Sequence, residues 1–215
     1  MPLFCQTPQT LNIIRELQTP MAKRGVILVD GSNLYMSARR FDIKVWPPDI
    51  RSLIHPELRG EFEPIIPVHF FTSVDRKNAS QQRFLNHIAK SDVIVHDYDL
   101  KIYTQTETCP ECDKICARCG RDIRIKPHKE KMLDIAIATK MIELAYLKEP
   151  MPIDTFIIVS GDKDLIPAIR LLRKTLGKEV VVAGFRHDDP TKNSLAYEMN
   201  KEVNYIINLT KLLGL

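Results

Sequence analysis

Residues 156–165 read Phe-Ile-Ile-Val-Ser-Gly-Asp-Lys-Asp-Leu, and this stretch decides the fold. Its four apolar residues, three of them β-branched, predict a strand that is buried on both faces, as in a parallel sheet. The polar residues that follow predict a turn and the start of a helix, with Pro167 in the first helical turn. Asp162 and Asp164 are therefore expected at the carboxyl end of a buried strand, where open α/β sheets bind their ligands. A helix cap needs only one of the two carboxylates, which leaves the other for chemistry.

A second stretch repeats this pattern, because residues 24–34 read Arg-Gly-Val-Ile-Leu-Val-Asp-Gly-Ser-Asn-Leu. Asp30 ends the apolar run, and Asn33 supplies an amide that can hold water, a metal ion or a phosphate oxygen. The alternative is that Asp30 or Ser32 only caps the following helix and that Asn33 is merely exposed.

Strand-like and helix-like segments alternate along the rest of the chain, which predicts a doubly wound parallel sheet. The other expected strands are 65–71, 93–95 and 179–185, with an extended segment or edge strand at 98–103 and a strand or loop at 203–209. Helices are expected at 78–90, 129–147 and 193–202, of which 129–147 is the clearest. We expect residues 1–22 to be an N-terminal helical extension and residues 23–215 to be one α/β domain.

Asp134 lies one turn from the start of the helix expected at 129–147, beside its apolar stripe. It could serve only as a first-turn acid that complements the helix dipole. If it converges with Asp30, Asp162 and Asp164 at one sheet edge, however, the carboxylates would repel one another without a hard cation between them, so the cluster would imply Mg²⁺ or Mn²⁺.

Four of the five cysteines, Cys109, Cys112, Cys116 and Cys119, form two Cys-x-x-Cys pairs within a predicted insertion at 104–128. Two such pairs are the ligand set of a structural Zn²⁺ site, although only three residues separate them. Reduced free cysteines, or a site completed by His128, are the alternatives.

Charge is unevenly distributed although the formal net charge is only +4. Residues 114–131 carry seven Lys or Arg against two acids, which indicates either a solvated loop or a polyanion-binding surface. The sequence shows neither a signal-peptide pattern nor an apolar run of membrane-spanning length, so we expect a cytoplasmic protein.

Three motifs together resemble the NYN domain, a branch of the PIN-like ribonucleases. They are Val29-Asp30-Gly31-Ser32-Asn33, Glu130-Lys131-x-x-Asp134 and Ser160-Gly161-Asp162-Lys163-Asp164. The resemblance spans roughly residues 24–209 and implies a three-layer α/β/α sandwich with a mainly parallel sheet and metal-dependent hydrolysis of RNA. It also implies that the catalytic Mg²⁺ or Mn²⁺ ligands are Asp30, Asp134, Asp162 and Asp164, with Asn33 beside them.

Several further residues are expected to contact the RNA. Lys131 would neutralise charge near the phosphate, or would instead pair with Asp134. Ser160, and less clearly Ser73, would donate hydrogen bonds to a phosphate, and the basic loop would hold the RNA backbone through Arg118, Arg121 and Arg124.

This chain departs from the family pattern at two places. Many relatives have an Asp in the closing strand, where Val203-Asn204-Tyr205 stands here, and often Gly-Val before the helical Asp, where this chain has Met132-Leu133. The leading hypothesis is a metal-dependent ribonuclease, and a homodimer is compatible with the sequence. The alternatives are a catalytically weak or inactive RNA-binding or regulatory module and a phosphohydrolase that acts on a nucleotide.

The zinc hypothesis predicts that Cys112→Ser lowers the zinc content of the purified protein, because it removes one thiolate of a four-ligand shell. Elemental analysis measures this directly. Cys5→Ser is the control and should leave the zinc content at the wild-type level. Equal zinc content in wild type and Cys112→Ser would contradict the assignment.

Overall fold

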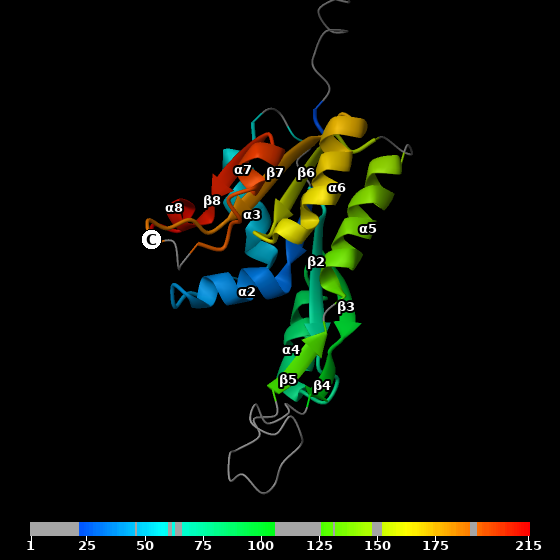
Figure 1. Cartoon of the computed structure of the whole chain (residues 1–215), viewed down its shortest axis with the longest axis vertical. Helices are drawn as coiled ribbons and strands as arrows, with labels where there is room; N and C mark the ends of the chain where they lie inside the picture. The colour runs from blue at the N-terminus through cyan, green and yellow to red at the C-terminus, as the bar shows by residue number, and fades with distance from the viewer. Residues whose placement is uncertain are drawn as a thin grey trace, which may run out of the picture.

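The computed structural model describes residues 22–45, 47–59, 62, 66–105, 126–130, 132–147, 152–189 and 193–215. Its main sheet has six parallel strands in the order β3-β2-β1-β6-β7-β8. Their bounds are β1 Gly25–Asp30, β2 Val68–Val74, β3 Val93–Asp99, β6 Thr155–Val159, β7 Glu179–Gly184 and β8 Tyr205–Asn208. The parallel α/β architecture predicted from the sequence is confirmed (Figure 1).

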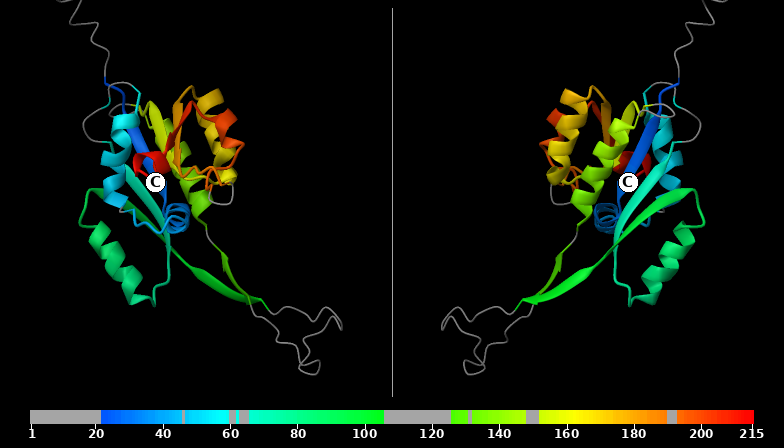
Figure 2. Two further views of the ribbon diagram at one scale, coloured as in Figure 1. Left: turned by 90° about the vertical axis from the view of Figure 1, so that its left-hand side faces the viewer. Right: turned by 90° about the vertical axis from the view of Figure 1, so that its right-hand side faces the viewer.

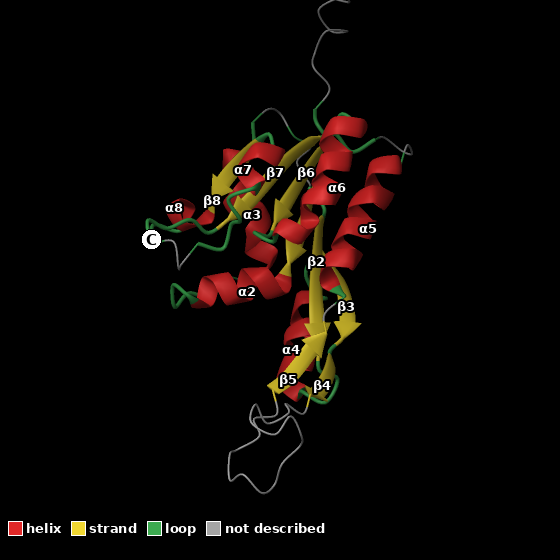
Figure 3. Cartoon of the chain, viewed as in Figure 1, coloured by secondary structure: helices red, strands yellow, loops and turns green. Residues whose placement is uncertain are grey.

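Helices cover both faces of the sheet (Figure 3). One face packs against α5 Leu133–Tyr146, α6 Ile166–Arg170 with its π-helical continuation Leu171–Thr175, and α7 Met199–Glu202. The other face packs against α2 Gly31–Arg39, α3 Ile50–Ile54, α4 Ala79–Ile88 and α8 Leu209–Leu212. Short 3₁₀ turns lie at Pro47–Asp49, His55–Glu57 and Lys163–Leu165.

The central strands are fully buried because their alternate side chains enter two separate cores. In β1, Val26 and Leu28 belong to the core under α5, whereas Ile27 and Val29 belong to the core under α2. This explains why the central strands read as continuous apolar runs rather than as an alternating pattern. Within the described residues, no helix has both the length and the hydropathy needed to cross a membrane.

The chain adds strands on one side of β1 first and then on its other side, although all six strands are parallel. The chain runs from β1 outward through β2 to β3, then returns to place β6 on the other side of β1 and continues outward to β8. The carboxyl ends of β1 and β6 therefore flank the topological switch point, where sheets of this kind open a crevice for ligands.

A two-stranded antiparallel hairpin, β4 Lys101–Gln105 with β5 Lys126–Glu130, projects away from the main sheet (Figure 2). The predicted edge strand at 98–103 is therefore divided between two sheets. The amide of Leu100 still bonds to the carbonyl of Val74 at 2.8 Å, but β2 ends there and the chain has no further partner in the main sheet.

The helix expected from Lys129 begins instead at Leu133, because residues 126–130 pair with β4 and this pairing overrides their helical pattern. The N-terminal extension, the cysteine cluster and the basic tip of the insertion lie outside the described residues. Their assignments remain predictions.

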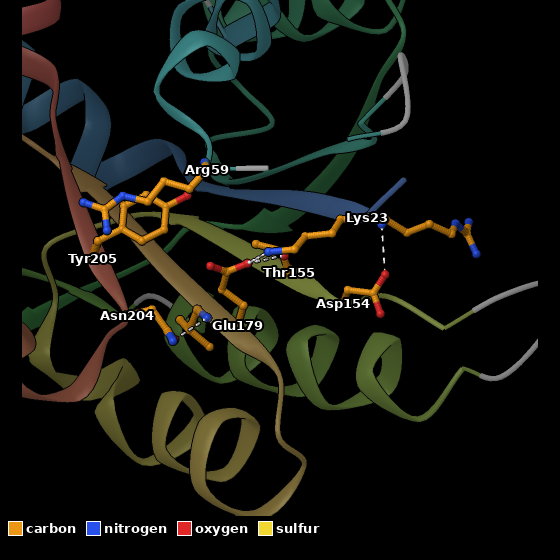
Figure 4. Close-up of polar contacts among 9 residues, drawn as sticks. Lys23, Arg59, Asp154, Thr155, Glu179, Asn204 and Tyr205 are labelled. Carbon is orange, nitrogen blue, oxygen red and sulfur yellow. Dashed lines mark hydrogen bonds and ion pairs between the residues drawn. The ribbon is translucent and has the colours of Figure 1, made fainter. Parts of the chain in front are cut away.

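Polar contacts hold the amino ends of three strands in register at the edge opposite the switch point (Figure 4). Glu179 at the start of β7 bonds both Lys23 and Thr155 at 2.9 Å, and the amide of Arg24 donates to Asp154 at 3.0 Å. These carboxylates already have protein partners. They therefore form a structural network, distinct from the acids at the carboxyl ends.

Two histidines on β2 and β3 form a stacked pair beside Phe71. His69 Nδ1 lies 2.9 Å from His96 Nε2, and the His96 ring stacks on Phe71 with centroids 4.5 Å apart. Burial, followed by the adjacent His96 and then Lys140 of α5, lowers the pKa of His69 to about 4, against a small opposing effect of Glu143. Burial also lowers the pKa of His96.

The low pKa of His69 predicts that the protein loses stability as the pH falls from 6.5 towards 4. In this window the unfolded chain binds a proton at His69 that the folded chain does not, which removes about 2 kcal/mol by pH 5. Urea unfolding at pH 7.5 and 5 measures the loss. It should be smaller in His69→Gln and unchanged in His55→Gln, whose side chain is exposed. An equal loss in wild type and His69→Gln would contradict the prediction.

Candidate metal centre

The turn after β1 fixes the carboxylate of Asp30 at the switch point. Asp30 is the N-cap of α2, and its Oδ1 accepts a hydrogen bond from the amide of Asn33 at 2.9 Å. The residue is only 4% exposed. The capping role considered from the sequence is therefore real, but a carboxylate has further lone pairs and can bind another group at the same time.

The turn after β6 has the same construction. Asp162 caps the 3₁₀ turn by accepting from the amide of Asp164 at 3.0 Å. Asp164 itself is exposed and does not act as the cap. One carboxylate thus shapes the turn, and the other lies beside it.

Two hydrogen bonds join the β1 and β6 turns. The hydroxyl of Ser160 donates to Asp30 Oδ2 at 3.2 Å, and the amide of Gly161 donates to Asn33 Oδ1 at 3.2 Å. The same Ser160 oxygen accepts from the amide of Asp162 at 3.2 Å. Residues about 130 positions apart are thereby held in one arrangement.

Ser160 and Asn33 consequently have positioning roles in this geometry. Ser160 is 2% exposed and its oxygen is engaged on both sides, so direct contact with a phosphate, as expected from the sequence, does not fit its burial. The amide oxygen of Asn33 is likewise occupied by Gly161, which leaves its NH₂ group as the donor for a ligand.

Asp134 joins the cluster from α5, on the face of the sheet opposite to α2. It lies in the first turn of α5, and its carboxylate falls within 4.8 Å of those of Asp162 and Asp164, one oxygen being taken from each. The amino end of α5 carries the positive end of the helix dipole, which offsets part of the repulsion between these acids.

The donor set fits a hard divalent cation. Two oxygens that bind one Mg²⁺ at about 2.1 Å lie at most about 4.2 Å apart, which is comparable to the spacing of this cluster. All three ligands are carboxylates, the type that Mg²⁺ and Mn²⁺ prefer. Asp30 lies outside this group of three and is linked to it through Ser160.

Two glycines allow the backbone to pack closely at the site. A Cβ on Gly31 would lie 2.6 Å from Phe70 Cζ, and one on Gly161 would lie 1.7 Å from the carbonyl oxygen of Ser194. The segment containing Ser194 was expected to begin a helix at 193. Instead, Ser194 and Phe185 exchange hydrogen bonds, and Ala196 donates to the carbonyl of Gly161 at 3.0 Å, so that α7 begins only at Met199.

The packing of residues 194–196 over Gly161, which we call the Gly161 clamp, was not predicted from the sequence. Its only sequence signal is the glycine between a strand and two acids. Several other predicted site residues, namely Lys131, Arg118, Arg121, Arg124 and the four clustered cysteines, lie outside the described residues. Ser73 is described at the end of β2, and its hydroxyl is buried without a hydrogen-bond partner among the described residues.

Comparison with known protein families gives a match that extends from the start of β1 to the end of β8. Residues 24–209 match the NYN domain. The chain belongs to the NYN domain family.

This NYN domain is also similar to the crystal structure of a protein of unknown function from Vibrio parahaemolyticus RIMD 2210633. The TM-score is 0.55 at 17% identity, over 89% of this chain and 96% of that one. No curated protein matches the chain. The similarity therefore supports the fold alone, and the family suggests a nuclease-type superfamily with the acidic cluster at its switch point.

The close packing at Gly161 predicts that Gly161→Ala destabilises the NYN domain by about 3 kcal/mol, because the new Cβ meets backbone that cannot rotate away. Chemical denaturation measures the loss. Gly184→Ala is the matched control, since its Cβ would meet only the end of the Leu195 side chain at 3.2 Å. Equal free energies of unfolding for the two variants would contradict the prediction.

Proposed function

We propose that this NYN domain is a metal-dependent ribonuclease that hydrolyses RNA phosphodiester bonds with Mg²⁺ or Mn²⁺. The observation that carries the proposal is the convergence of Asp134, Asp162 and Asp164 within 4.8 Å at the switch point, next to the buried Asp30. The family supports the same reaction class.

In this proposal the three clustered carboxylates hold the cation. A bound divalent cation would supply Lewis acidity, which lowers the pKa of a water nucleophile and offsets charge on the phosphate. Asp30 is kept in place by the hydroxyl of Ser160 and by the amide of Asn33, and Ser160 connects it to the turn that carries Asp162. Its negative charge adds to the cluster's affinity for cations.

The chain's own residues also orient the substrate. The NH₂ group of Asn33 and the amino end of α5 present N–H donors to a phosphate at the cluster. Lys131, two residues before α5 in the sequence, and the arginines Arg118, Arg121 and Arg124, in the sequence between β4 and β5, would hold the RNA backbone through its charge. The predicted zinc site would stabilise the segment that carries these arginines.

The proposal predicts that Asp162→Asn and Asp30→Asn each reduce RNA cleavage by roughly 100-fold or more, because several kcal/mol of charge stabilisation are lost. Asn caps a helix as well as Asp does, so the fold should remain intact. The assay is cleavage of a labelled single-stranded RNA with Mn²⁺ or Mg²⁺, with circular dichroism to check folding.

Asp154→Asn is the matched control, because it removes a carboxylate at the opposite end of the same strand. It should leave cleavage unchanged. RNA binding without cleavage by the wild type would instead indicate the inactive binding module. Release of phosphate from mononucleotides, with oligonucleotides left intact, would indicate a nucleotide phosphohydrolase.

A further inference from the structure

A polar groove of about 500 Å³ lies at the carboxyl ends of β7 and β8, on the same edge of the sheet as the acidic cluster. We call it the β7/β8 groove. It contains one Arg, one His, one Asp, three Asn, one Leu and one Tyr, namely Arg186, His187, Asp188, Asn193, Leu195, Tyr197, Asn200 and Asn208. The cluster and its metal chemistry make no use of these residues.

The groove and the acidic cluster share one segment of backbone. Leu195 lines the groove, and its Cα lies 2.8 Å from the position that a Cβ on Gly161 would take. The other side of the groove is tied to α2, since Arg40 donates to the carbonyl of Asn193 at 2.8 Å. The nine residues of α2 span roughly 13 Å from Asp30 at its start, a distance that a few nucleotides bridge.

Hydrogen bonds within the protein hold the polar groups of the groove in fixed positions. Asn193 accepts from the amide of His187 at 2.7 Å, and Asn208 caps α8. Since their oxygens are used in this way, their NH₂ groups remain as donors for a ligand. Asn200 accepts from Arg186 and donates to the carbonyl of Tyr197 at 2.8 Å, so it fixes the guanidinium.

His187 contributes one more donor. Its Nδ1 accepts a hydrogen bond from the amide of Asp189 at 2.9 Å, which places the ring proton of the neutral imidazole on Nε2. The groove therefore combines several N–H donors with the single carboxylate of Asp188. Donors and an acceptor together suit the edge of a nucleobase, whereas a phosphate alone would favour positive charge.

Tyr197 supplies a stacking surface at this groove. Its side chain is 74% exposed, and the ammonium of Lys201 lies 5.8 Å from the centre of its ring. Exposed aromatic rings beside a cation are the features by which proteins stack bases of single strands and neutralise the attached phosphate.

We propose that the β7/β8 groove binds an unpaired nucleobase of the RNA strand, a few nucleotides from the phosphate at the acidic cluster, with Tyr197 stacking on the base. The proposal rests on the ribonuclease function proposed above. It makes the groove the part of the site that distinguishes single-stranded RNA from duplex, because a paired base cannot leave its stack to enter.

The test is the affinity for a fluorescent ten-nucleotide single-stranded RNA, measured by anisotropy in a buffer without added Mg²⁺ or Mn²⁺, so that cleavage does not accompany binding. Tyr197→Ala should raise the Kd roughly 10-fold, the loss expected for one stacked base, whereas Tyr197→Phe should bind like the wild type. Tyr146→Ala is the matched control, since Tyr146 is 61% exposed at the far end of α5 from Asp134. Its Kd should not change.

The outcomes separate the two proposals. If Tyr197→Ala weakens binding but the wild type cleaves no RNA, the groove stands and the nuclease function fails. If Asp162→Asn abolishes cleavage but Tyr197→Ala binds like the wild type, the groove assignment is wrong and the nuclease function stands. Equal effects of Tyr197→Ala and Tyr146→Ala, or equal affinity of the wild type for duplex and single-stranded RNA, would also overturn the groove assignment.

Discussion

The hydroxyl group of Ser160 holds together the two turns on which the acidic edge depends. It donates to the carboxylate of Asp30 and accepts from the backbone amide of Asp162, so one side chain links the turns after two neighbouring strands. A buried carboxylate such as Asp30 is stable only when its oxygens have such partners. Together with the parallel pairing of β1 and β6, this contact holds Asp30 beside the turn that carries Asp162.

The central strands and the acids at their ends were predictable because the signals are local. An apolar run followed by Asp-Gly or Gly-Asp marks a buried parallel strand and its turn, and both Asp30 and Asp162 lie where this pattern places them. The role of Ser160 was not predictable, since its burial depends on a residue about 130 positions away. The start of α5 and the length of α7 were wrong for a similar reason. Pairing with β4 and packing against Gly161 are tertiary contacts that override helical periodicity.

The charged residues at the amino and carboxyl ends of the strands have different roles. At the amino ends, charged side chains such as Glu179 and Asp154 are matched with partners that fix the strands. At the carboxyl ends, like charges gather at one place, which costs stability unless a ligand compensates them. The segment that passes over Gly161 also contributes Leu195 to the β7/β8 groove, so the acidic edge and the groove share this stretch of backbone.

The projecting hairpin is close in sequence to one part of the acidic edge. Its second strand ends at Glu130, and α5 begins at Leu133 with Asp134 in its first turn. Asp162 and Asp164, in contrast, follow a strand in the middle of the sheet. The hairpin is thus separated by only two residues from the helix that carries one carboxylate of the cluster, whereas the other two carboxylates belong to the turn after a central strand.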